Sequence, residues 1–266
     1  MDLMLACRNL GFRYGAVPVL QDISFTVEKG RFCVVLGRNG SGKTTLIHCL
    51  NRILQPTTGQ VFIDGKNMTA LSRNEIARAV SLVPQEHMDI FPFQVIDVVV
   101  MARAPFLGTA AAPKTRDYEL AADALKQLHA IHLAEKNFNR ISGGERQIVL
   151  LARAIAQNAR IMLLDEPTNH LDFNNQYHLL SAIKELCRSS RLCIVASMHD
   201  PNLASLFADD VIMLKNGGIL YQGPGRTIMT SRHISHLYDI ATHSIGITDQ
   251  KRLFLPEQVM KHPPLS

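Results

Sequence analysis

The pattern of apolar and polar positions predicts two kinds of β-strand along the chain. Within Leu20–Glu28, apolar residues alternate with polar ones from Ile23 onward, the period of a strand with one buried and one exposed face. Three later segments are short and continuously apolar, which is typical of parallel strands covered on both faces. They are Phe32–Leu36, Ile161–Leu164 and Leu192–Ala196. We therefore predict an antiparallel sheet near the N-terminus and a parallel central sheet.

Apolar residues three and four positions apart predict helices between these strands. One such stripe follows the strand at Phe32–Leu36, and two more precede the strand at Ile161–Leu164. Their members are Leu46, Leu50, Ile53 and Leu54, then Ala121, Ala124, Leu125 and Leu128, then Ile148, Leu151, Ala152 and Ile155. Strands that alternate with helices indicate an α/β fold. We expect a mostly helical insert at about residues 86–158.

The last part of the chain carries the pattern of a β-hairpin followed by a short appendage. Val211–Leu214 and Ile219–Tyr221 are apolar and flank Asn216-Gly217-Gly218, residues that tolerate the positive φ angles of a tight turn. Beyond the hairpin we expect a helix and a tail, over residues 224–266. No internal repeat is visible, so residues 1–223 are expected to form a single domain with the helical insert inside it.

The composition allows a large folded domain and excludes few partners. The chain has 266 residues, 47% of them hydrophobic, and a net charge of +5, which permits anionic ligands without selecting one. Its five cysteines include no Cys-x-x-Cys pair, so buried reduced thiols are expected rather than disulfides or zinc. No segment has the length and apolarity of a membrane helix, and the N-terminus lacks the pattern of a signal peptide. We therefore expect a cytosolic protein.

A glycine-rich segment between the first parallel strand and the first helix predicts a phosphate-binding loop. Gly37 to Thr44 match the pattern Gly-x-x-x-x-Gly-Lys-Ser/Thr in the strand-loop-helix context that it requires. Glycines let backbone N–H groups turn toward phosphate oxygens, and the helix N-terminus adds partial positive charge. Lys43 would reach the β- and γ-phosphates and Thr44 would ligate Mg²⁺, whereas the alternative is a plain glycine-rich turn. The predicted phosphate-binding residues are Gly37, Asn39, Gly40, Ser41, Gly42, Lys43, Thr44 and Thr45.

Two acidic residues end a second predicted strand. Asp165 and Glu166 follow the apolar run Ile161–Leu164, at the carboxyl edge of the sheet, where open α/β sheets bind ligands. Asp165 is the expected Mg²⁺ ligand. Because side chains alternate along a strand, Glu166 should point the other way, and we predict that it polarises the water that attacks ATP. The alternative, a solvated acidic strand end, is less favourable beside a phosphate loop.

A third segment predicts a second helix start suited to an anion. Ser142 and Glu145 have the spacing of a capping box immediately before the stripe that begins at Ile148. One bound nucleotide rarely needs two such helix ends from one chain, so the second end would serve a nucleotide held by another copy. An ordinary capped helix is the alternative. This segment therefore predicts a dimer.

Together these residues resemble the ABC ATPase family. The resemblance covers Leu3–Gly223 and depends on six motifs in the order and spacing of the family. They are the phosphate loop at Gly37, Gln85 in Leu-Val-Pro-Gln, the signature at Ser142, the pair Asp165-Glu166, Leu171-Asp172, and His199. The resemblance implies an α/β fold with a P-loop NTPase (RecA-like) core, a parallel central sheet, an antiparallel β subdomain and an inserted α-helical subdomain. It also implies ATP hydrolysis, with ATP and Mg²⁺ as cofactors.

The resemblance assigns further roles. Two cassettes of the family pack head to tail, so that the signature of one contacts the nucleotide of the other. Here the signature would contribute Ser142, Gly143, Gly144 and Glu145, and Asp172 would also contact nucleotide.

In the same family an aromatic residue near the N-terminus stacks on adenine. Tyr14 stands at that position, with core packing as the alternative. Gln85 would sense Mg²⁺ and the attacking water, and His199 would contact the γ-phosphate. The predicted catalytic residues are Glu166, His199, Gln85 and Lys43, and the predicted metal ligands are Thr44, Gln85 and Asp165.

The resemblance is strongest with the motor subunits of importers for ferric siderophores, haem, cobalamin and, in some members, molybdate or tungstate. It implies a homodimer on the cytoplasmic face of the inner membrane, bound to two integral-membrane permease subunits and indirectly to a substrate-binding protein, without nucleic acid. In the family, the surface that corresponds to Phe91, Phe93 and Val95–Val100 contacts the permease. Core packing is expected for most of the valines and is the alternative for Phe91 and Phe93. An exporter motor and a soluble ABC ATPase that acts on nucleic acid remain open.

Overall fold

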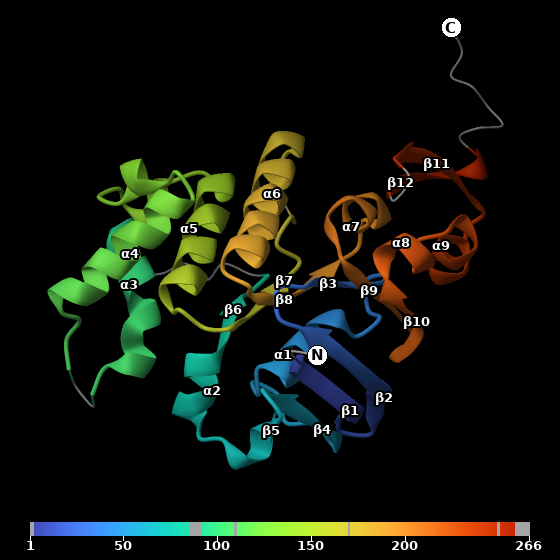
Figure 1. Ribbon diagram of the computed structural model, residues 1–266, viewed down its shortest axis with the longest axis horizontal. Coiled ribbons are helices and arrows are strands. Elements are labelled where there is room, and N and C mark those ends of the chain that lie inside the picture. The colour runs from blue at the N-terminus through green and yellow to red at the C-terminus, as the bar shows by residue number, and fades with distance from the viewer. Residues whose placement is uncertain (1–2, 86–91, 109–110, 170, 249–250, 259–266) are drawn as a thin grey trace, which may run out of the picture.

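The structure is a computed structural model that describes residues 3–85, 92–108, 111–169, 171–248 and 251–258 (Figure 1). A mostly parallel sheet lies at the centre, between a layer of helices on one face and a smaller antiparallel sheet with further helices on the other. Three helices of the insert lie at one end of the molecule, and the C-terminal elements lie at the opposite end. This arrangement leaves the carboxyl ends of the central strands accessible for a ligand.

The central sheet confirms the predicted parallel strands. Its order is β10-β9-β3-β8-β7-β6, with every neighbouring pair parallel except β10 and β9. Along β3, the residues Phe32, Val34 and Leu36 pack into one hydrophobic cluster, whereas Cys33 and Val35 pack into another. Because both faces are covered, the strand reads as a continuous apolar run. The strands are β3 (Phe32–Leu36), β6 (Val80–Val83), β7 (Ile161–Asp165), β8 (Cys193–Met198), β9 (Asp210–Lys215) and β10 (Gly218–Pro224).

The antiparallel sheet near the N-terminus is also as predicted. Its order is β2-β1-β4-β5, and all its pairs are antiparallel. In β2, Ile23, Phe25 and Val27 are buried, so the alternation in sequence corresponds to one face packed on the core. The strands are β1 (Leu3–Tyr14), β2 (Val17–Glu28), β4 (Thr58–Ile63) and β5 (Lys66–Asn67).

Helix α1 (Lys43–Leu50) lies between the two sheets and is shorter than its apolar stripe suggested. Leu46 and Leu50 are buried as predicted. The helix ends at Leu50, and Arg52 has a φ of 57°, so Ile53 lies beyond the helix with 55% of its surface exposed. The stripe therefore predicted the buried face correctly but placed the end of the helix too late.

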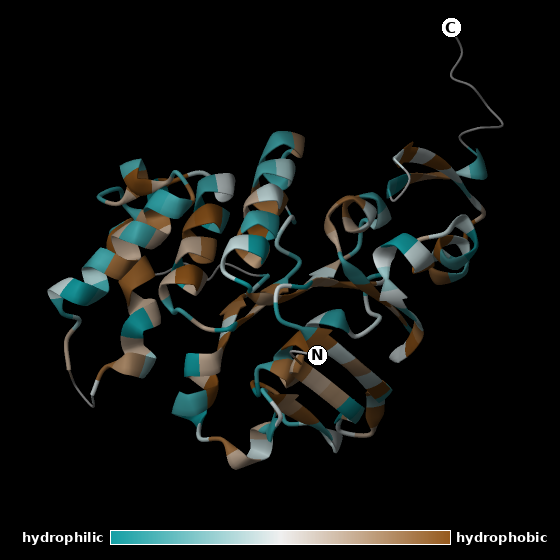
Figure 2. Ribbon diagram, in the orientation of Figure 1, coloured by the Kyte–Doolittle hydropathy of each residue, from teal (hydrophilic) through white to brown (hydrophobic). Residues whose placement is uncertain are grey.

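The helical insert follows β6 and lies at one end of the central sheet (Figure 2), and its buried residues share one hydrophobic cluster with a face of that sheet. Ala121, Ala124 and Leu125 are buried, as the stripe predicted. Val95 and Val98–Val100 are also buried, because this short helix lies within the insert's core. These valines are therefore core residues, as expected for most of them; Phe93 is 40% exposed, and Phe91 lies outside the described residues. The helices on this side are α3 (Val95–Val100), α4 (Thr115–Gln127), α5 (Gly143–Ala156), α6 (Phe173–Ser189) and α7 (Pro201–Phe207), whereas α2 (Arg73–Ala79) packs in the same cluster as α1 and the antiparallel sheet.

Residues beyond 224 differ from the predicted helix and tail. Two helices, α8 (Gly225–Ile228) and α9 (Ser231–Tyr238), precede an antiparallel hairpin of β11 (Thr242–Thr248) and β12 (Lys251–Pro256). The hairpin has a weak sequence pattern because most of its residues are exposed, although Phe254 is buried. It packs against α7, and this contact rather than its own pattern stabilises it.

The turn between β9 and β10 confirms the predicted hairpin and joins it to the antiparallel sheet. Asn216 and Gly217 have φ angles of 50° and 76°, as a two-residue hairpin turn requires. The Gly217 carbonyl accepts a hydrogen bond of 2.8 Å from the backbone N–H of Gln21 on β2. A Cβ atom at Gly217 would lie 2.3 Å from the carbonyl oxygen of Val19. The close approach therefore depends on a glycine.

We predict that Gly217→Ala lowers the free energy of unfolding more than Gly65→Ala does. Both glycines have a φ of 76°, so both substitutions carry the cost of a left-handed backbone, about 1–2 kcal/mol. Only at Gly217 would the new methyl group also collide with a carbonyl oxygen, since no atom lies within 4 Å of a Cβ at Gly65. Urea unfolding followed by circular dichroism measures both losses. Equal losses would contradict the close approach to Val19.

Candidate active site

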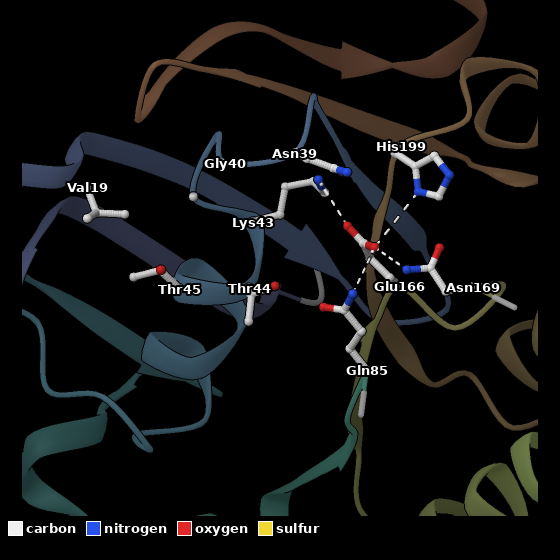
Figure 3. A pocket seen from close by; sticks show the side chains of 11 residues that line it. Val19, Asn39, Gly40, Lys43, Thr44, Thr45, Gln85, Glu166, Asn169 and His199 are labelled. Atoms are coloured by element: carbon white, nitrogen blue, oxygen red, sulfur yellow. Dashed lines mark hydrogen bonds and ion pairs between the residues drawn. The ribbon is translucent and has the colours of Figure 1, made fainter. Parts of the chain in front are cut away.

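A cavity of about 530 Å³ lies at the carboxyl ends of the central strands (Figure 3). The phosphate loop forms one side, and the ends of β6, β7 and β8 bring polar side chains to the other. Parallel strands place these ends at one edge of the sheet, which explains why residues far apart in sequence meet there. The lining residues are Val19, Asn39, Gly40, Gly42, Lys43, Thr44, Thr45, Gln85, Glu166, Asn169 and His199.

The phosphate loop has the geometry of an anion cradle. Gly40 and Gly42 have φ angles of 80° and 102°, which glycine adopts readily. Gly42 caps α1 without a side chain, so the N–H groups of the first helical turn remain available to a ligand. The Oγ atom of Ser41 is buried and has no hydrogen-bond partner among the described residues. A buried hydroxyl without a partner fits a phosphate oxygen.

Lys43 is nearly inaccessible to water and is held from three sides. Its side chain is 4% exposed, and its Nζ atom donates to the carbonyls of Gly37 and Arg38 at 3.1 and 3.2 Å. It also forms an ion pair of 3.1 Å with Oε1 of Glu166. A buried ammonium group needs such partners, because an unpaired charge in this environment is costly. The same contacts aim the charge of Lys43 into the cavity.

Asp165 lies at the end of β7, with two hydroxyl groups donating to one of its oxygens. Ser197 Oγ donates to Asp165 Oδ1 at 2.6 Å, and Thr44 Oγ1 donates to the same atom at 3.2 Å. Asp165 is only 1% exposed. The carboxylate and hydroxyl oxygens of Asp165 and Thr44 are hard ligands beside the phosphate loop, and they fit Mg²⁺, which takes few protein ligands when it is shared with phosphates.

Four side chains of the cavity, those of Lys43, Gln85, Asn169 and His199, are directed toward Glu166 (Figure 3). Its Oε2 atom accepts hydrogen bonds from Gln85 Nε2 at 3.3 Å and from Asn169 Nδ2. The Nδ1 atom of His199 lies 3.9 Å from the same oxygen. The predicted residues Lys43, Gln85, Glu166 and His199 are thus brought together.

Asp165 and Glu166 lie in different surroundings, as predicted. The cause is the backbone conformation of Glu166 and not the alternation of side chains along a strand. The strand ends at Asp165, and Glu166 has a φ of 46°, in the left-handed region. The carboxylate of Glu166 therefore turns into the cavity, with a side chain 9% exposed, rather than projecting from the opposite face of the sheet. This conformation strains a non-glycine residue by about 1–3 kcal/mol, as often occurs at functional sites.

The signature residues and Asp172 do not line this cavity. Ser142 caps α5 with the predicted capping box: its Oγ accepts from the Glu145 N–H at 3.3 Å, and Glu145 Oε2 accepts from the Ser142 N–H at 2.8 Å. The backbone N–H of Ser142, and after it the Oγ of Ser142 at 2.8 Å, donate to the Glu145 carboxylate and hold the pKa of Glu145 below its usual value. Asp172 caps α6 and accepts a hydrogen bond from the N–H of Asn175.

Glycines bring the signature close to α6. A Cβ atom at Gly144 would lie 2.8 Å from the side chain of Asn175, whereas nothing lies within 4 Å of a Cβ at Gly143. The face of the signature at Gly143 is therefore open. Tyr14 is also outside the cavity lining, and its ring is 53% exposed with an edge contact to Phe12, so it is not a core residue.

Two residues that sequence reasoning did not assign to the site contact its carboxylates. Ser197 donates to Asp165 and accepts from the N–H of Glu166 at 2.8 Å. It lies opposite Asp165 in the parallel register of β7 and β8, and a serine at the end of an apolar strand was the available signal. Asn169 had no such signal, because its contact with Glu166 depends on the turn that follows β7.

Comparison with known proteins decides the family. The sequence profile of the ABC transporter family matches residues 20–169. The chain belongs to the ABC transporter family. It is therefore an ABC ATPase, the ATP-binding subunit of a transporter, and the predicted P-loop NTPase architecture with its parallel and antiparallel sheets is confirmed.

Two curated relatives of this ABC ATPase are similar over nearly their whole length. A protein of Helicobacter pylori (strain J99) named as a probable iron chelatin transport ATP-binding protein is 36% identical, covering 93% of this chain and 98% of its own. The molybdate import ATP-binding protein MolC of Haemophilus influenzae is 36% identical and covers 90% of each chain.

Two solved structures support the same relationship. A chain described as part of an inward-facing, metal-chelate type ABC transporter has a TM-score of 0.85 and 34% identity, covering 96% of this ABC ATPase and 98% of that chain. A dimeric cassette in a post-hydrolysis state bound to ADP and Pi has a TM-score of 0.73 and 26% identity, covering 84% and 99%. Within the described residues, no helix combines the length and the hydropathy needed to cross a bilayer.

We predict that Ser197→Ala lowers the free energy of unfolding by about 1–3 kcal/mol, because it removes the shorter of the two hydrogen bonds to Oδ1 of the buried Asp165 and leaves the N–H of Glu166 without a partner. Ser81→Ala is the matched control, since Ser81 is equally buried on β6 of the same sheet but only donates to the carbonyl of Ile161, at 3.3 Å. Chemical denaturation compares the two variants. If Ser197→Ala lowers the free energy of unfolding no more than Ser81→Ala does, the bonds of Ser197 to Asp165 and Glu166 contribute no more to stability than the single bond of Ser81.

Proposed function

We propose that the chain is the ATP-hydrolysing subunit of an importer for metal chelates, such as ferric siderophores, haem or cobalamin. The observation that supports hydrolysis most directly is the convergence of Lys43, Gln85 and His199 on Glu166 within one cavity. Import of a metal chelate is supported by the similarity to the iron chelatin protein and to the metal-chelate type transporter chain. Molybdate or tungstate import is the second candidate, because MolC is as similar in sequence.

The phosphate loop would hold the phosphates of ATP. The N–H groups after Gly40 and Gly42 would bind phosphate oxygens, with Asn39, Ser41 and Thr45 at the border of the loop. Lys43 would exchange part of its contact with Glu166 for the β- and γ-phosphates. Thr44 and Asp165 would hold Mg²⁺, with Gln85 nearby, and the bound ion would neutralise charge on the phosphate oxygens.

Glu166 would orient and polarise the attacking water. Phosphoryl transfer needs positioning more than covalent chemistry, so a fixed carboxylate beside the γ-phosphate is suited to this role. Gln85 and Asn169 hold one of its oxygens, which orients the carboxylate without removing its charge. His199 has a half-exposed side chain that reaches toward the cavity and would donate to the γ-phosphate.

A second copy would complete the site. Ser142 and its neighbours and Asp172 lie outside the cavity lining, and the N-terminus of α5 with its open Gly143 face is suited to a phosphate held by another chain. The dimeric cassette bound to ADP and Pi supports this arrangement. The exposed ring of Tyr14 is available to stack on adenine.

A groove beside α2 is the proposed contact with the permease. This groove of about 620 Å³ is lined by the apolar residues Ile53, Ile76 and Leu82 and by arginines that include Arg73 and Arg153. Arg153 is half-buried and has no ion pair or side-chain hydrogen bond among the described residues, and burial lowers its pKa. A short permease helix with apolar and acidic side chains would cover Ile53 and neutralise Arg153. The chain would then lie peripherally on the cytoplasmic face of the membrane.

We predict that Glu166→Gln lowers ATP turnover by about 10²–10⁴-fold, because the amide cannot polarise water as a carboxylate does. ATP binding should persist, since the phosphate loop is unchanged, and the dimer should accumulate with ATP bound. Phosphate release and size-exclusion chromatography with ATP measure the two effects. Glu185→Gln, on the exposed face of α6, is the control. Normal turnover in Glu166→Gln would remove Glu166 from this role.

We predict that tagged Glu166→Gln protein, purified from native membranes with ATP, recovers a polytopic membrane protein and a substrate-binding protein that carries a metal chelate. Adding Ile53→Asp should reduce recovery of the membrane partner at least about tenfold, because a charge would enter an apolar contact. Ile247→Asp is the control, since Ile247 is 49% exposed on the distant hairpin.

The identity of the recovered chains decides between the candidate functions. Bound molybdate or tungstate in the binding protein would favour the second candidate, and an export partner without a binding protein would contradict import. Recovery of nucleic acid or of soluble partners alone would contradict the transporter. Unchanged recovery with Ile53→Asp would place the contact elsewhere.

A further inference from the structure

The elements after residue 224 contact both loops that carry the predicted reaction chemistry. Helix α9 ends at Tyr238, beside the turn that carries His199, and the next residue, Asp239, reaches the phosphate loop. The hairpin strand β12 packs on α7, the helix that begins directly after His199. Figure 1 shows these C-terminal elements beside α7. A segment with no residue in the cavity lining thus touches two sides of the active site.

Tyr238 holds the backbone of His199. Its hydroxyl donates to the carbonyl oxygen of His199 at 2.6 Å. The preceding carbonyl, that of Met198, accepts a hydrogen bond of 3.3 Å from the N–H of Gly37 in the phosphate loop. Burial, with the charge of Asp200 adding to it, raises the pKa of Tyr238. The hydroxyl therefore stays protonated and remains a donor.

The helix that follows His199 is fixed to the hairpin as well. The side-chain amide of Asn202 bonds both backbone groups of Phe254: its Oδ1 accepts from the N–H at 2.7 Å and its Nδ2 donates to the carbonyl at 3.3 Å. Ser205 Oγ accepts from the N–H of Arg252 at 3.1 Å. The start of α7 is therefore held independently of His199, and Tyr238 acts on the turn that precedes it.

Asp239 provides a second, weaker contact. It lies in the left-handed region with a φ of 55° and binds Lys215 at 2.6 Å and Arg38 of the phosphate loop at 3.3 Å. The side chains of Arg38 and Asp239 are more than half exposed, so this ion pair contributes little. The bond from Tyr238 is the contact of this segment that can affect the reaction.

The imidazole of His199 has little else to fix its position. Its side chain is 50% exposed, and its contact with Glu166 spans 3.9 Å, longer than a hydrogen bond. A side chain without close packing takes its position from its backbone. A small displacement of a group that contacts the transferred phosphate can cost a large part of the rate.

We infer that Tyr238 is a positioning residue for ATP hydrolysis: its hydroxyl fixes the peptide carbonyl of His199 and so places the imidazole over the cavity. This inference rests on the proposed role of His199. It assigns to the C-terminal segment a function in catalysis, in addition to covering the end of the sheet.

The test compares two tyrosines that differ in one contact. Tyr238→Phe removes the bond to His199, whereas Tyr221→Phe removes a hydroxyl bond to His236 of the same helix α9, with no contact to the cavity. We predict that Tyr238→Phe lowers kcat about three- to tenfold, the value of one neutral hydrogen bond, with KM for ATP unchanged. Tyr221→Phe should leave kcat unchanged, and both variants should have similar Tm values.

Each variant is also made in the His199→Ala background. If Tyr238 acts through His199, Tyr238→Phe should cause no further loss there. The inference would be overturned by a normal kcat in Tyr238→Phe, or by an equal fall in kcat in Tyr221→Phe. It would also be overturned if Tyr238→Phe lowered the kcat of the His199→Ala variant by as much as it lowers that of the unmodified protein. If His199→Ala itself keeps normal turnover, the proposed role of His199 fails, which is distinct from a failure of Tyr238 alone.

Discussion

The buried ion pair between the ammonium group of Lys43 and the carboxylate of Glu166, at 3.1 Å, is the interaction on which the arrangement of the site depends. Lys43 and Glu166 have side chains 4% and 9% exposed. Charges so deeply buried must be surrounded by partners, because desolvation otherwise exceeds their attraction. The carbonyls of Gly37 and Arg38 supply partners for Lys43, and Gln85 and Asn169 supply them for Glu166. The loop, the strand ends and the turn after β7 are therefore held in one arrangement.

The sequence predicted the central part of the fold well because local pattern and tertiary position agree there. Phe32–Leu36 is buried on both faces and reads as continuously apolar, and Asn216-Gly217 has the residues that its turn requires. The phosphate loop was equally clear, since its glycines are needed by the backbone itself. In these segments the residues that the local backbone conformation favours are also the residues that the tertiary structure requires.

Prediction failed where tertiary contacts decide. The hairpin β11–β12 has a weak pattern of its own and depends on its packing against α7. Ser197 could not be assigned to the site from sequence, because its contact with Asp165 depends on the register between β7 and β8. The turn of Glu166 into the cavity depends on a left-handed φ that no alternation rule supplies. The site could thus be located from sequence, but its supporting contacts could not.

Two glycines from different loops approach the same carbonyl oxygen, that of Val19. A methyl group on Gly217 would lie 2.3 Å from this oxygen, and one on Gly42 would lie 3.2 Å from it. The antiparallel sheet, the phosphate loop and the β9–β10 turn therefore meet at one atom, beside a side chain that lines the cavity. Neither sheet can slide along the other without separating this junction. The spacing between β2 and the phosphate loop is accordingly set by the absence of two methyl groups.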